Sequence, residues 1–313
     1  MLRALAASSD SPHKLVGHPD EADAILITDV FFDHCFWRIL ANPLVRRNLN
    51  RTYLYCEKAI AYRILPGLFT SMPVRTRDLG RYRAAMYTSH NQRLCNAFLE
   101  PTYQESVSPD LLFSYMGRRS HPIRQRILRT FSGETHCHLE DTSGYHHWDT
   151  AADNRNDFQA RYALVMARSH FVLCPRGWSP TTIRIFETMQ MGRVPVILSD
   201  DWRRPLGPDW NSFAVFWPER QLSALPAYLT ALEGEAPAMG RRSRRAWEEY
   251  FAPAREWATL ANSLQDLHDS RQADERRLMP LWPLLLLIST IHYGGYRLGL
   301  KFRNGLRQGK PSA

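Results

Sequence analysis

The sequence lacks the features that mark several common classes of protein. Its five cysteines are an odd number without tight spacing, unlike the paired cysteines of a disulfide-stapled secreted domain. The first residues contain no apolar core of about 7 to 15 residues, so we expect neither a secretory signal nor an N-terminal membrane anchor. These two features predict a reducing, cytoplasmic location. Peripheral contact with the inner face of a membrane is compatible with that location.

Patterns typical of nucleic-acid and zinc-binding proteins are also missing. We find no helix-turn-helix, RRM or zinc-finger spacing, and the arginines are dispersed, so no nucleic-acid partner is expected. The run 136–138 and the pair 146–147 contain histidines and one cysteine, but a polar loop explains them better than a metal site. We therefore predict no metal and no cofactor.

The composition itself is that of a folded protein. Of 313 residues, 44% are hydrophobic and 23% charged, close to the average for a soluble globular chain. Forty Lys and Arg against 31 Asp and Glu leave a net charge of +9, which favours anionic partners.

Short apolar runs alternate with segments of helical periodicity along most of the chain. This alternation predicts parallel sheets covered by helices, in two facing α/β domains at residues 1–108 and 109–270, followed by a tail at 271–313. Strands are expected at 24–28, 52–56, 111–116, 171–174 and 194–198, helices at 31–40, 121–130, 162–167 and 179–191, and loops at 65–73 and 101–109.

The segment from Ser169 to Glu187 carries most of the chemistry. An apolar strand ends at Pro175, Arg176 and Gly177 follow in a loop, and Ser179-Pro180 is a good start for a helix. A helix N-terminus beside a flexible glycine and an arginine is a site for an anion such as phosphate.

Two further pairs of polar residues flank this segment. Arg184 and Glu187 are three residues apart and so share one helix face, either as functional groups or as a surface ion pair. Asp200 and Asp201 follow the strand at 194–198, where open α/β sheets bind ligands. Nearby Trp202, Trp210 and Trp217 fit sugar stacking and core packing equally well.

Residues 169–217 resemble the exostosin domain of glycosyltransferase family 47. The resemblance rests on Cys-Pro-Arg-Gly at 174–177, Arg-x-x-Glu at 184–187, Gly-x-Val-Pro-Val-Ile-Leu-Ser at 192–199 and Asp-Trp-x-x-Phe-x-Val at 209–215. Residues 18–23, and Leu112–Gly117 followed by Arg124, are similar to other parts of the family pattern.

The resemblance implies a GT-B-like fold of two Rossmann-like domains, with a tail that returns to the first. It also implies a hexosyl- or glycuronosyltransferase that uses a nucleotide-sugar donor, UDP foremost, and a glycan or lipid-linked acceptor, inverting and without metal. Transferred by position, Arg176 and Arg184 become diphosphate contacts, Glu187 binds the ribose, and Asp200 or Asp201 faces the donor sugar. Arg124, Gly177 and Thr182 complete the implied donor site. Animal exostosins have further arginines where this chain has Trp178-Ser179, which bears on the donor's identity.

Inversion requires a general base near the acceptor hydroxyl, in the N-terminal domain. Asp29 and Asp33, just after the first predicted strand, are the candidates, with His34 and Glu57 behind them; a helix cap is the competing role for each. The competing function is a non-catalytic α/β protein that binds a nucleotide or sugar phosphate.

The tail is apolar and then basic. Residues 278–291 are apolar but interrupted by Pro280 and Pro283 and too short to span a bilayer, and the basic residues of 297–310 follow without an acid. Residues 278–310 therefore either pack on the first domain as a final helix or contact an anionic membrane surface.

Overall fold

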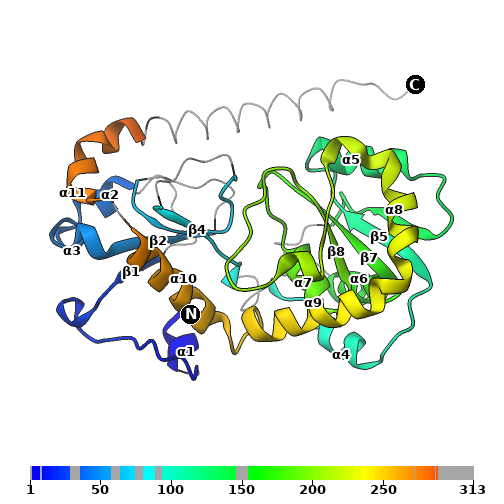
Figure 1. Ribbon diagram of the computed structural model, residues 1–313, viewed down its shortest axis with the longest axis horizontal. Coiled ribbons are helices and arrows are strands. Elements are labelled where there is room, and N and C mark those ends of the chain that lie inside the picture. The colour runs from blue at the N-terminus through cyan, green and yellow to red at the C-terminus, as the bar shows by residue number, and fades with distance from the viewer. Residues whose placement is uncertain are drawn as a thin grey trace.

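The chain builds two parallel β-sheets with helices on their faces, as Figure 1 shows. The computed structural model describes residues 2–7, 9–28, 36–57, 64–74, 80–88, 94–145, 154–271, 273–285 and 287. The prediction of an α/β fold with two Rossmann-like sheets is confirmed.

The first sheet has four strands in the order β1-β2-β3-β4. They are β1 (Ile25–Thr28), β2 (Thr52–Cys56), β3 (Gly67–Phe69) and β4 (Tyr82–Ala84). Side chains alternate between the two faces of a strand. Leu54 and Cys56 therefore pack toward α2 and α3, whereas Tyr53 and Tyr55 pack toward α10.

The second sheet has five strands in the order β6-β5-β7-β8-β9. They are β5 (Leu111–Gly117), β6 (Cys137–Asp141), β7 (Ser169–Pro175), β8 (Val194–Leu198) and β9 (Val215–Phe216). Val172 and Cys174 of β7 enter one core, and Phe171 and Leu173 enter the core on the opposite face. Both faces are buried, which explains why these strands are continuous apolar runs in the sequence.

Eleven helices are described. They are α1 (Leu2–Ala7), α2 (Phe36–Ala41), α3 (Pro43–Arg47), α4 (Leu99–Gln104), α5 (Pro122–Thr130), α6 (Arg155–Ala167), α7 (Arg184–Gln190), α8 (Leu225–Leu232), α9 (Ala236–Tyr250), α10 (Glu256–Ser270) and α11 (Glu275–Leu278). Figure 1 shows α5 and α8 on one side of the second sheet and α7 and α9 on the other.

The polypeptide crosses between the two sheets after α9. Trp247 of α9 lies in a core of the second sheet, whereas Leu260 and Leu267 of α10 pack on the first (Figure 1). Leu99 of α4 lies in the same core as Trp247. Helix α4, from the predicted first domain, therefore covers the second sheet. Helix α10, from the predicted second domain, covers the first sheet.

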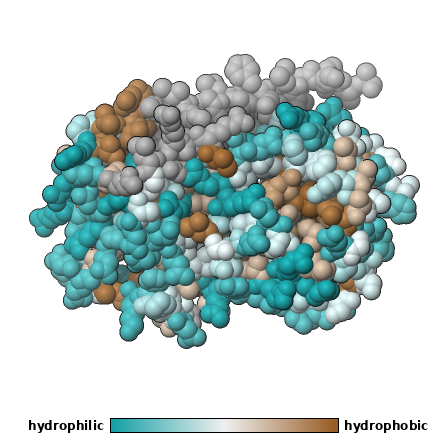
Figure 2. All heavy atoms as spheres, viewed as in Figure 1, coloured by the Kyte–Doolittle hydropathy of each residue, from teal (hydrophilic) through white to brown (hydrophobic). Residues whose placement is uncertain are grey.

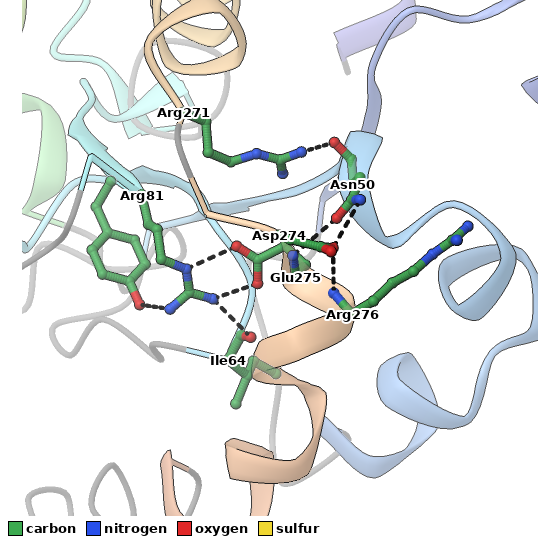
Figure 3. A network of polar contacts seen from close by, with 8 residues as sticks. Asn50, Ile64, Arg81, Arg271, Asp274, Glu275 and Arg276 are labelled. Atoms are coloured by element: carbon green, nitrogen blue, oxygen red, sulfur yellow. Dashed lines mark hydrogen bonds and ion pairs between the residues drawn. The ribbon is translucent and has the colours of Figure 1, made fainter.

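A buried ion pair attaches the segment after α10 to the first sheet. The Arg81 guanidinium donates to both carboxylate oxygens of Glu275 at 2.9 and 2.7 Å, and Glu275 is fully buried. Asn50 donates to Asp274 at 3.0 Å and accepts from the backbone N–H of Glu275 at 2.9 Å (Figure 3). The start of the tail, including buried Trp282, is thus part of the first sheet's core.

The predicted loops contain regular structure. Residues 65–73 include β3, and residues 101–109 include the end of α4, so both predictions are wrong there. Strand β3 has only three residues, too few for a recognisable alternation, and α4 contains Pro101, which usually argues against a helix.

Candidate functional site

Loops at the carboxyl ends of the strands converge on a cavity of about 710 Å³. A volume of this size suits a nucleotide or a comparable ligand, because ligand pockets commonly enclose about 300 to 1,000 Å³. The described residues that line it include four arginines and two glutamates: Arg118, Arg119, Arg124, Arg184, Glu57 and Glu187. Both sheets contribute, since Glu57 directly follows β2 and the other five belong to the second-sheet part of the chain.

Arg184 is the best-placed cation of the cavity. Its side chain is only 8% exposed, its Nε donates to Tyr162 Oη at 3.1 Å, and its Nη2 donates to the carbonyl of Met116. Nη1 is buried without a hydrogen-bond partner. Burial alone would lower the pKa of Arg184, but the adjacent Tyr162 and Tyr115 raise it overall, so the guanidinium stays charged.

Gly117 makes room for this arginine at the end of β5. A Cβ atom at that position would lie 3.0 Å from Arg184 Nη2 and 2.5 Å from Tyr115 Oη. Only glycine therefore lets the guanidinium reach the end of the strand without displacing these groups.

Glu187 lies one helical turn after Arg184 and is equally buried, at 8% exposure. Tyr162 Oη donates to Glu187 Oε2 at 2.8 Å and accepts from Arg184 Nε, so one phenol joins the two charged side chains. Burial raises the pKa of Tyr162 well above its ordinary value, which keeps the phenol protonated. The pair is thus a buried, connected network rather than a surface ion pair.

The predicted start of the helix that carries this pair is wrong. Helix α7 begins at Arg184, not at Ser179-Pro180, and residues 176–183 form a loop. Ser179 Oγ accepts from the N–H of Thr181 at 3.2 Å and donates to Ser71 Oγ at 2.7 Å, so it closes a local turn and contacts the first-sheet part of the chain. An anion in the cavity would therefore meet side chains rather than the N-terminus of a long helix. The end of α7 lies at Gln190, one residue before the end of the predicted helix, and Gly192 follows with φ +63°.

The other implied donor-site residues take different positions. Arg124 donates to the carbonyls of Arg176 at 3.0 Å and Pro175 at 3.2 Å, so much of its guanidinium holds the loop after β7. Gly177 and Thr182 line the cavity. Arg176 is not among the residues that line it and lies 3.6 Å from Asp201 in an ion pair.

Asp200 lies at a second cavity of about 720 Å³. Its Oδ1 accepts from the N–H of Glu219 at 3.1 Å, and Trp202 and Trp217 line the same cavity. Trp210 is buried in a core of the second sheet. The structure thus does not bring Asp200 and Asp201 together with Arg184 and Glu187 in the first cavity.

Of the candidates for the base, Glu57 lies in the described part of the chain. It is 9% exposed, and its Oε1 accepts from Tyr55 Oη and, at 2.9 Å, from Thr88 Oγ1. Asp29, Asp33 and His34 lie outside the described residues.

Sequence reasoning missed several residues of the cavity. Tyr162, Tyr145 and Phe158 line it, and the last two rings stack with centroids 3.6 Å apart. Arg118 and Arg119 directly follow β5, so the rule that ligands bind at the carboxyl ends of strands would have identified them. No comparable sequence pattern identifies Tyr162, because it contacts α7 only through the tertiary fold.

Among the described residues, no group of three or more His, Cys, Asp or Glu side chains is arranged to hold a metal ion. His138 lies 3.4 Å from Glu140, and Cys137 points toward the carbonyl of Glu134 at 3.5 Å. The pair 146–147 lies outside the described residues.

Comparison with known sequences identifies the relatives of this region. Residues 87–232 match the sequence model of a family described as the Exostosin GT47 domain. Exostosin-1 of Drosophila melanogaster is 32% identical over 113 residues, which cover 33% of this chain and 15% of that protein. The exostosin-1 homolog of Caenorhabditis elegans is 38% identical over 90 residues, or 26% of this chain and 24% of that protein.

A plant protein is similar as well. A probable glucuronosyltransferase of Oryza sativa subsp. japonica is 35% identical over 82 residues, or 26% of this chain and 19% of that protein. The chain spans less than a quarter of the length of each of these three relatives.

Proposed function

We propose that this protein, whose residues 87–232 match the Exostosin GT47 domain, is a glycosyltransferase in polysaccharide biosynthesis. It transfers a hexosyl or glycuronosyl group from a nucleoside-diphosphate sugar, UDP foremost, to a glycan acceptor, free or lipid-linked. The observation that carries this proposal is the Arg184–Tyr162–Glu187 network in the cavity, where one guanidinium nitrogen is buried without a partner.

The chemistry of transfer supports this assignment. Departure of a nucleoside diphosphate develops negative charge, and preorganised arginines in a site shielded from water stabilise that charge. Arg184 would contact the diphosphate, with exposed Arg118 and Arg119 at the rim. Glu187 is fixed by Tyr162 as an acceptor for a ribose hydroxyl.

An inverting reaction also needs a base on the acceptor side. Glu57 supports such an arrangement, because it follows a first-sheet strand and lines the same cavity as Arg184. Asp29 and Asp33 remain alternative bases. Arginines would take the place of a metal, so we expect turnover to persist in the presence of EDTA.

Nucleotide binding and turnover, measured side by side, test the proposal. A nucleotide that binds only the folded protein at about 100 times its Kd adds about 2.7 kcal/mol to the free energy of unfolding. We expect UDP, and not a short oligonucleotide, to raise the midpoint of thermal unfolding. We also expect one of a panel of UDP and GDP sugars to release its nucleoside diphosphate when a glycan acceptor is added.

The outcomes separate the competing functions. Stabilisation by a nucleotide without turnover of any sugar in the panel would favour the non-catalytic nucleotide- or sugar-phosphate-binding protein. Stabilisation by the oligonucleotide alone would overturn the proposal.

A further inference from the structure

The segment from α11 to residue 287 has a buried side and an apolar exposed side. On the buried side, Glu275 pairs with Arg81, and Trp282 is only 4% exposed within the core of the first sheet. On the other side, four large aliphatic side chains are 42 to 55% exposed: Met279, Leu281, Leu284 and Leu287. We call these four residues the aliphatic strip. Figure 2 shows a hydrophobic surface over the residues that follow α11.

The spacing explains how one segment presents both sides. Residues 282–285 and 287 are helical, and Leu281, Leu284 and Leu287 recur every three residues, on one helix face. Trp282 and Leu285 fall on the opposite face and contact the first-sheet core. Single exposed leucines are common on soluble proteins, whereas a contiguous row of them marks a contact surface.

The charge beside the aliphatic strip is mostly positive. Arg276 and Arg277 are exposed at its start, and the Arg277 side chain is 88% exposed even though it lies 3.6 Å from Asp274. From residue 276 to residue 313 the sequence contains seven Lys and Arg and no Asp or Glu. An apolar strip beside exposed arginines matches the chemistry of an anionic lipid surface, where acyl chains lie beneath negative headgroups.

We propose that the aliphatic strip and the exposed Arg276 and Arg277 bind the surface of an anionic lipid bilayer. The opposite side of the segment stays packed on the first sheet, so packing and membrane contact involve different faces of one segment. The contact is interfacial: among the described helices, none has the length and hydropathy to cross a bilayer.

A second copy of the chain is a less suitable occupant. In a two-fold dimer built on this surface, the same arginines would approach each other from both protomers. Residues 276–287 contain no acid, and the adjacent Asp274 already pairs with Arg277. The proposal does not depend on the transferase activity.

Sedimentation of the full chain with vesicles tests the proposal. The vesicles contain phosphatidylcholine alone or phosphatidylcholine with phosphatidylserine, at low and at high salt. We expect binding to the anionic vesicles at low salt and release at high salt, because headgroup attraction is screened. We expect the double variant Leu284→Asn/Leu287→Asn to bind more than about tenfold more weakly, because two half-exposed leucines lose their apolar contact with lipid.

A matched variant controls for surface hydrophobicity in general. Leu164→Asn removes a leucine of α6 that is 45% exposed, similar to those of the aliphatic strip, and it should bind vesicles like the parent. Both variants change exposed side chains, so their thermal unfolding midpoints should equal that of the parent.

Three outcomes would overturn the proposal. One is no binding of the parent to anionic vesicles at low salt. Another is equal binding by the double variant and the parent, which would assign the attraction to basic residues elsewhere. The third is a dimer in solution that Leu284→Asn/Leu287→Asn dissociates, which would make the aliphatic strip a protein interface.

Discussion

Arg184 combines deep burial with incomplete pairing. In a purely structural network each polar atom of the buried guanidinium would have a partner, because an unpaired buried donor is destabilising. Nη1 of Arg184 has none, and that nitrogen belongs to a side chain that lines the cavity. The network therefore has a vacant donor position for an anionic ligand.

We predict that Arg184→Ala and Glu187→Ala each weaken UDP binding more than tenfold. A hydrogen bond to a charged group contributes about 1.5 to 3 kcal/mol, which corresponds to that loss. Isothermal titration with UDP measures the effect, and thermal unfolding verifies that each variant is folded. Arg126→Ala, which alters an exposed arginine of α5 away from the cavity lining, is the control. Parental affinity in both Arg184→Ala and Glu187→Ala would remove the network from the donor site.

A second prediction concerns the base. We expect Glu57→Gln to lower turnover by about 10²- to 10⁴-fold, with UDP affinity close to that of the parent, because proton abstraction and not donor binding is lost. Steady-state rates and UDP titrations on the same preparation make the comparison. Asp29→Asn and Asp33→Asn are measured alongside. Full activity of Glu57→Gln together with inactivity of either aspartate variant would assign the base to that aspartate.

The residues that sequence reasoning identified, and those it missed, differ in a physical way. Arg184 and Glu187 were predictable because helical spacing alone places them on one face. Tyr162, which joins them, lies 22 residues before Arg184 on another helix, and no local pattern encodes that contact. Arg176 was assigned to the anion site from its place after an apolar strand and by resemblance, but its ion pair with Asp201 depends on how two loops pack.

At the scale of secondary-structure elements, the length of a strand decided whether the sequence predicted it. The strands β2, β5, β7 and β8 have five to seven residues with mostly apolar side chains, and each was predicted within about two residues of its ends. The three-residue strands β3 and β4 exist because neighbouring strands supply their hydrogen bonds, which the local sequence does not show. The start of α7 was misplaced because Ser179 closes a turn instead of capping the helix.

The buried pair that attaches α11 leads to a third prediction. Glu275→Ala leaves the Arg81 charge buried without its partner and should lower the free energy of unfolding by about 3 to 5 kcal/mol. The double variant Arg81→Met/Glu275→Leu replaces both charges with apolar groups, so its free energy of unfolding should fall much less. Urea denaturation monitored by tryptophan fluorescence gives both values. Equal losses in the single and double variants would contradict a coupled pair.

An exposed pair on the same helix is the matched control. Arg277 lies 3.6 Å from Asp274, but its side chain is 88% exposed. Exposed ion pairs contribute little to stability, so Arg277→Ala should leave the urea midpoint unchanged.

For the whole molecule, buried thiol and phenol groups predict a loss of stability at high pH. Burial raises the pKa of the Cys174 thiol from 9.0 to about 12, and burial also raises the pKa of Tyr55 and Tyr162 well above 10.0. Well below pH 9 these groups are protonated in both states and add no pH dependence. Between pH 9 and 12 they ionise in the unfolded chain but not in the folded one, so the free energy of unfolding falls as pH rises.

Urea midpoints measured from pH 8 to pH 11 verify this fourth prediction. Each such group contributes a slope of at most about 1.4 kcal/mol per pH unit. Cys174→Ala should therefore have a shallower decline than the parent, while Cys95→Ala, which changes an exposed thiol, should follow the parent curve. Identical slopes in the parent and Cys174→Ala would show that this thiol does not contribute to the pH dependence of stability.

The crossover of α10 and α11 to the first sheet also has a consequence for the order of events during synthesis. Arg81 and Glu275 are 194 residues apart, so a ribosome adding about 5 to 20 residues per second completes the second of them about 10 to 40 s after the first. In that interval the whole second sheet, residues 111–216, leaves the exit tunnel with its neighbouring helices. The part of the chain made first is therefore completed last, and the face with Tyr53 and Tyr55 stays uncovered until α10 is synthesised.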